Sequence, residues 1–110
     1  MRMKSATTEI LAMTTCPDNA LAGQIARNLV EQKLAACVNC LPAMRSIYLW
    51  QGKVEDDEEV LLIAKTTEEM LQKLEACVSE MHPYELPEML TVPISSGSEA
   101  YLNWIRQSLQ

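Results

Sequence analysis

The side chains best suited to chemistry gather in one short segment, His-Pro-Tyr-Glu-Leu-Pro-Glu at residues 82–88. It holds the only histidine of the chain, together with a phenol and two carboxylates. Its two prolines keep the backbone extended, because each fixes its own φ and disfavours helix in the residue before it. The segment is therefore either a ligand site in a stiff frame or a rigid connector in which His82 and Tyr84 satisfy buried backbone groups.

Metal binding is the first chemistry that this segment could support. The imidazole of His82 can bind a metal ion near neutral pH, and Met81 beside it adds a soft sulfur. Cys16 lies at a predicted strand-to-helix turn, where a thiol can be partly exposed near a helix N-terminus. We predict His82 and Cys16 as metal ligands, whereas Cys37 and Cys77 are predicted to pack as small hydrophobic residues.

Composition and missing motifs exclude several classes of function. There is no nucleophile elbow, no H-E-x-x-H and no glycine-rich phosphate loop, and a single histidine without a recognisable partner does not indicate an enzyme. A net charge of −6 argues against nucleic-acid binding. No apolar run reaches signal-peptide or membrane-spanning length, so we expect no membrane association and a cytoplasmic protein with reduced cysteines.

The elements that must position these residues follow from the spacing of apolar side chains. Apolar runs predict strands at residues 9–15, 37–50, 53–64 and 89–94, the second bent near Pro42 and joined to the third by a turn at 51–52. Helical periodicity predicts helices at residues 19–33 and from a capping box at 66–69 to 81, and a last helix capped by Ser98 with Tyr101, Leu102, Ile105 and Leu109 inside. Residues 95–98 are predicted as a turn, and the acidic run 55–59 as a solvated face or a subunit contact.

The order β-α-β-β-α-β plus a short terminal helix is that of the ferredoxin-like α+β fold, in a single domain over residues 1–110. Two helices would cover one face of the sheet and leave the other open. The hairpin is also too long for so small a sheet. We therefore predict an oligomer in which the hairpin pairs with a neighbouring subunit.

Five stretches in this order, residues 34–39, 46–53, 65–67, 82–88 and 101–105, make the chain resemble the CutA divalent-ion tolerance family. The resemblance runs from about Glu9 to Leu109. It implies a cytosolic homotrimer similar in architecture to the PII signalling proteins, a link to copper and other divalent ions, and no established catalysis. Some members carry a His pair where this chain has Met81-His82, and some carry a Cys at the position of Thr14, two residues before Cys16.

Two functions of different classes follow from this resemblance. The first is a trimeric metal-responsive protein that binds copper or another divalent ion through His82 and Cys16. The alternative is a PII-like regulator that binds a small organic molecule in a cleft between subunits. Its predicted lining is Trp50 as a stacking surface with Lys65, Tyr84, Glu85 and Glu88 as polar groups.

Overall fold

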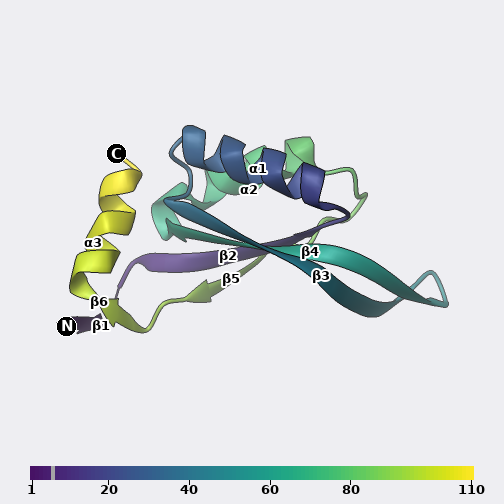
Figure 1. The fold of residues 1–110 in the computed structure, drawn as a ribbon, viewed down its shortest axis with the longest axis horizontal. Coiled ribbons are helices and arrows are strands. Elements are labelled where there is room, and N and C mark those ends of the chain that lie inside the picture. Colours follow the sequence, from purple (N-terminus) through teal and green to yellow (C-terminus); the bar gives the residue numbers. More distant parts are fainter. Residues whose placement is uncertain (6) are drawn as a thin grey trace.

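The computed structural model describes residues 1–5 and 7–110 of the chain (Figure 1). The strands are β1 (Met3–Ser5), β2 (Glu9–Cys16), β3 (Cys37–Trp50), β4 (Lys53–Thr67), β5 (Leu90–Pro93) and β6 (Ser96–Ser98). The helices are α1 (Asn19–Glu31), α2 (Leu71–Met81) and α3 (Glu99–Ser108), and a short 3₁₀ turn covers Glu68–Met70. None of the helices described is both long and apolar enough to span a bilayer.

Four of the strands form an antiparallel sheet in the order β3-β4-β2-β5, and α1 and α2 lie side by side on one of its faces (Figure 1). This arrangement confirms the predicted ferredoxin-like α+β fold. The hairpin of β3 and β4 extends beyond the helices to one end of the molecule. Helix α3 and both chain termini lie at the opposite end (Figure 1).

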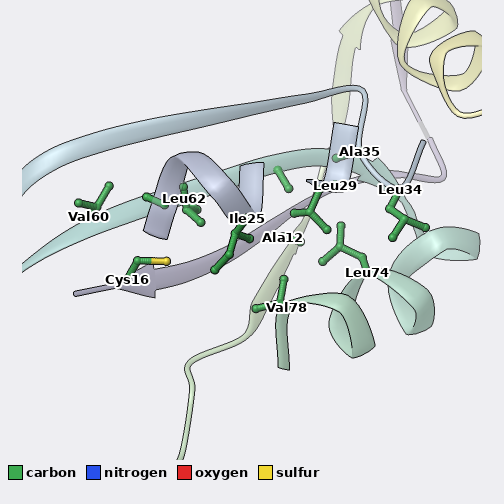
Figure 2. Packing of buried hydrophobic residues seen from close by; sticks show 12 residues of the cluster. Ala12, Cys16, Ile25, Leu29, Leu34, Ala35, Val60, Leu62, Leu74 and Val78 are labelled. Atoms are coloured by element: carbon green, nitrogen blue, oxygen red, sulfur yellow. The ribbon is translucent and has the colours of Figure 1, made fainter. Parts of the chain in front are cut away.

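The core lies between the two helices and the sheet (Figure 2). Ile25 and Leu29 of α1 and Leu74 of α2 are almost completely buried, because the helical periodicity turns them toward the strands. They meet side chains that alternate along β2 and β4, since every second residue of a strand points to the same face. Among these are Ala12 and Leu62.

The hairpin has the turn and the bend that the sequence predicts. Gln51 and Gly52 have φ values of 49° and 78°, which suits a tight turn whose twist matches that of the strands. The pairing of β3 with β4 shifts register between Leu41 and Met44, and Ala43 has a φ of 62°. Such a bulge next to Pro42 bends the strand and accommodates a residue that cannot donate to the ladder.

Three local predictions are wrong. Thr67 precedes the 3₁₀ turn without a capping hydrogen bond, and Thr66 instead donates from Oγ1 to the carbonyl of Leu34 at 2.7 Å, so the capping box does not form. Residues 96–98 are not only a turn but form β6, which pairs with β1. Tyr101 is 42% exposed and does not face the core, although Ser98 caps α3 as predicted.

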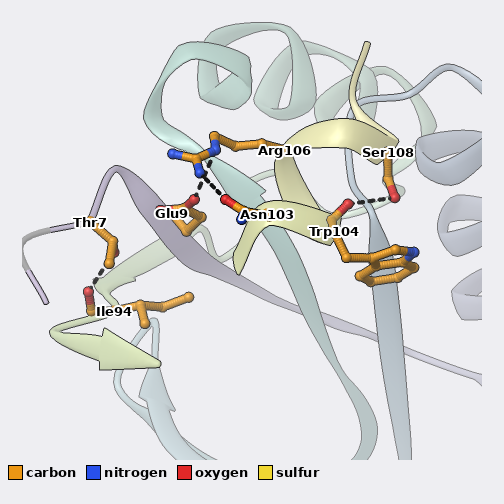
Figure 3. Close-up of polar contacts among 7 residues, drawn as sticks. All are labelled: Thr7, Glu9, Ile94, Asn103, Trp104, Arg106 and Ser108. Atoms are coloured by element: carbon orange, nitrogen blue, oxygen red, sulfur yellow. Dashed lines mark hydrogen bonds and ion pairs between the residues drawn. The ribbon is translucent and has the colours of Figure 1, made fainter. Parts of the chain in front are cut away.

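Helix α3 is held against the start of β2 by an unusual ion pair (Figure 3). The Glu9 side chain is 1% exposed, and neither of its carboxylate oxygens has a hydrogen-bond partner among the described residues. Arg106 Nε lies 3.5 Å from Glu9 Oε1, while its Nη2 donates to the side chain of Asn103. The guanidinium therefore compensates a buried carboxylate that has little else to stabilise it.

Replacing Arg106→Gln should destabilise the protein by about 1–3 kcal/mol, because it leaves the charge of Glu9 buried and uncompensated. The free energy of unfolding in urea measures this effect. Arg27→Gln is the control, since Arg27 is exposed on α1. Adding Glu9→Gln to the Arg106 variant should recover part of the loss. A double variant less stable than Arg106→Gln alone would contradict the pairing.

Candidate functional site

A cavity of about 750 Å³ lies between the β3–β4 hairpin and the segment that follows α2. The residues of its lining that carry aromatic or charged groups are Tyr48, Trp50, Glu59, Tyr84, Glu85 and Glu88. The hairpin supplies the first three because it extends past the end of α2. The stiff, proline-containing segment supplies the others from the facing wall.

His82 lies behind this wall and is committed to the backbone. Its side chain is buried, Nε2 lies 2.6 Å from the carbonyl of Thr15, and Nδ1 accepts a hydrogen bond from the Tyr84 N–H at 3.2 Å. A neutral imidazole that donates from Nε2 satisfies both contacts. His82 thus fastens the segment to the end of β2, which is the connector role that the sequence left open beside the ligand role.

Cys16 packs in the core and is fully buried. Burial, together with smaller effects of Cys40 and Asp18, raises the pKa of the Cys16 thiol to about 11. The raised pKa makes it more costly to form the thiolate that metal ligation needs. As folded, His82 and Cys16 do not fit a resident metal centre, and the described residues contain no cluster of three or more His, Cys, Asp or Glu suited to a metal ion.

Two phenols in the cavity wall are held by carboxylates. Tyr84 donates its hydroxyl to Glu59 Oε2 at 3.0 Å, and Tyr48 donates to Asp57 Oδ2 at 2.6 Å. Burial and the bond to Glu59 raise the pKa of Tyr84, and the bond to Asp57 raises the pKa of Tyr48 to about 12. Both phenols stay protonated at neutral pH, so these bonds fix their rings against the cavity.

The cavity lies within one chain, whereas the sequence predicted a ligand cleft between subunits. It brings together four of the five residues predicted for that cleft, namely Trp50, Tyr84, Glu85 and Glu88. Lys65 is not among its lining residues. Instead its Nζ donates to the hydroxyl of Tyr101 at 3.2 Å and lies 5.5 Å from the centre of that ring. Sequence reasoning missed Glu59, because the acidic run 55–59 suggested a solvated face.

Comparison with known proteins identifies relatives over nearly the whole chain. Residues 10–108 match the family model for the CutA1 divalent ion tolerance protein. The chain is 45% identical over 100 residues to the divalent-cation tolerance protein CutA of Thermus thermophilus, covering 91% of this chain and 97% of that protein. It is 46% identical over 96 residues to the human protein CutA, covering 87% of this chain but only 54% of that longer protein.

The fold agrees with this relationship. The solved structure of CutA from Synechococcus elongatus is 37% identical in sequence and superposes with a TM-score of 0.94, covering 99% of this chain and 96% of that one. Both the matched length and the identity are large, so the likeness is one of family and not of fold alone. This chain belongs to the CutA1 divalent ion tolerance protein family.

Proposed function

We propose that this chain acts in divalent-cation tolerance as a homotrimer in the cytoplasm, that copper is an ion it responds to, and that it catalyses no reaction. The observation that carries this proposal is the family match over residues 10–108. The four cysteines are free thiols, which suits a reducing compartment.

The open face of the sheet supports self-association. Leu11 pairs with Val92, and Met13 pairs with both Leu90 and Ile63, so these apolar side chains share the face away from α1 and α2. Leu90 is 57% exposed and Val92 is 41% exposed in the single chain. A contiguous apolar face of this kind favours burial against another subunit.

Copper binding by His82 would require the imidazole to give up one of its two backbone contacts. An imidazole nitrogen that ligates a metal cannot also hold its present backbone partner, so His82 would have to release either Thr15 or the Tyr84 N–H. This condition requires a rearrangement of the segment that forms the cavity wall. We therefore expect copper binding to disturb the cavity.

Titration of the reduced protein with copper(I) and copper(II), with the mass followed by light scattering, tests this role. We expect saturable binding at a fixed number of ions per trimer, lost in His82→Gln. Glutamine is the informative replacement, because its amide N–H can still donate to the Thr15 carbonyl. Weak, unsaturable binding by a stable trimer, or unchanged binding in His82→Gln, would make the metal incidental.

A second candidate function is a regulator that binds a small organic ligand. The cavity favours it, because one hollow brings together Trp50, Tyr84, Glu85 and Glu88. Its volume is within the usual range for small-molecule sites. A thermal-shift screen against a metabolite panel tests this function, since a ligand that binds only the folded state raises the melting temperature. Stabilisation by metal salts alone would count against it.

A further inference from the structure

The charged side chains in the lining of the cavity are all acidic. Glu59, Glu85 and Glu88 are carboxylates, and no Lys, Arg or His belongs to the lining among the described residues. The same walls carry the aromatic rings of Trp50 and Tyr84. A ligand that complements both features is positively charged and has an apolar body, because aromatic faces and carboxylates both attract cations.

Glu59 gives this charge a fixed position. It is 7% exposed, and its Oε2 is already the acceptor for the Tyr84 hydroxyl. The described part of the chain places no Lys, Arg or His within ion-pair distance of it. A buried carboxylate without a countercharge costs free energy of folding. A cation bound beside Glu59 would supply that countercharge and so stabilise the folded protein.

The spread of the carboxylates favours an organic cation over a metal ion. A divalent metal needs several oxygen, nitrogen or sulfur ligands converging within about 2–2.6 Å of one point. The described residues offer no such cluster of three or more His, Cys, Asp or Glu. The cavity instead has room for a small molecule and ring faces for its apolar part.

We infer that this cavity binds a small organic ammonium ion, with the charged nitrogen beside Glu59 and the apolar body against Trp50 and Tyr84. The inference rests on the small-ligand function proposed above as the second candidate, and it names the chemical class of that ligand. The hydroxyl of Tyr84 donates to Oε2 of Glu59 and so holds this carboxylate in place. The other oxygen of Glu59, Oε1, accepts no hydrogen bond from the described residues.

Calorimetric titration of the full chain with three probes of one shape tests the inference. Benzylammonium, benzyl alcohol and benzoate differ mainly in charge. We expect benzylammonium to bind saturably and about tenfold or more tightly than the other two, because a charge-assisted hydrogen bond is stronger than a neutral one. The affinity should fall with added salt. In a Trp104→Phe background Trp50 is the remaining tryptophan, so a change in its fluorescence would place the probe in the cavity.

Matched variants test whether Glu59 and Trp50 contact the bound probe. Glu59→Gln removes the charge but keeps an oxygen that accepts from Tyr84, and it should weaken benzylammonium binding by about tenfold. Glu75→Gln makes the same charge change on the exposed side of α2 and should leave binding unchanged. Trp50→Leu, at a partly exposed position, should weaken binding by about fivefold without unfolding the protein.

The outcomes distinguish a failure of this inference from a failure of the small-ligand function on which it rests. Benzoate or benzyl alcohol binding as tightly as benzylammonium, and lost in Trp50→Leu, would overturn the ammonium ligand while supporting a small-ligand cavity. Benzylammonium binding that is unchanged in Glu59→Gln would also overturn it. No binding by any probe would overturn it and leave the role in divalent-cation tolerance untouched.

Discussion

Shortening the hairpin should reduce the mass of the protein in solution from about three chains to about one. Arg45 and Glu58 are paired across the hairpin, so residues 46–57 can be replaced by Asn-Gly to form a two-residue turn between them. The removed part carries Ile47, Leu49 and Val54, which are 65%, 69% and 66% exposed in the single chain. These side chains share one face of the hairpin and need a partner surface.

Light scattering measures this effect, and circular dichroism checks that the shortened chain is folded. The control changes only Gln51 to Asn, which gives the same Asn-Gly turn at full hairpin length and should leave the mass unchanged. A folded, shortened protein that keeps the mass of the full-length assembly would show that the hairpin does not hold the subunits together. The assembly would then depend on the open face of the sheet.

Replacing Ile25→Ala should lower the free energy of unfolding by about 2–5 kcal/mol. Ile25 is 0% exposed, and it packs within the cluster that joins α1 to the sheet (Figure 2). Truncation removes buried apolar surface and leaves a cavity, because the surrounding strands can relax only in part. Unfolding in urea at a fixed protein concentration measures the loss, since the stability of an oligomer depends on concentration.

Val30→Ala on the same helix is the control, because Val30 is 42% exposed. Its effect should stay within about 1 kcal/mol. Equal losses for the two variants would mean that the solvent side of α1 is covered in the assembled protein. In that case the interface between subunits would extend over the helices as well as the hairpin.

Most of the fold could be predicted because its elements are long and periodic. The stripe of α1 carries about one buried side chain per turn, which fixes the face that meets the sheet. The apolar runs that became β2 and the second half of β4 are mostly buried, as their composition predicts. The strands β1 and β6 were missed because each has only three residues, too few to show an apolar period, and each pairs with the other. The capping box failed because the hydroxyl of Thr66 finds a buried carbonyl instead.

The site was harder to predict because its contacts join distant parts of the chain. His82 and the Thr15 carbonyl are 67 residues apart in sequence, and Tyr84 and Glu59 are 25 apart. The residue types in the segment 82–88 suggested a site, but they could not show that both ring nitrogens of His82 are occupied. Nor could the uniformly acidic run 55–59 show that the carboxylate of Glu59 is buried and accepts a hydrogen bond from Tyr84.

The two chain ends lie at the end of the molecule away from the hairpin tip (Figure 1). The longest dimension of the chain is 47 Å, so a fluorophore or surface linker attached at either terminus would be remote from the cavity wall contributed by Trp50. Protein immobilised in this way would leave the tip free to meet solutes and other subunits. Attachment to a sensor chip through either terminus should therefore leave ligand binding in the cavity unobstructed.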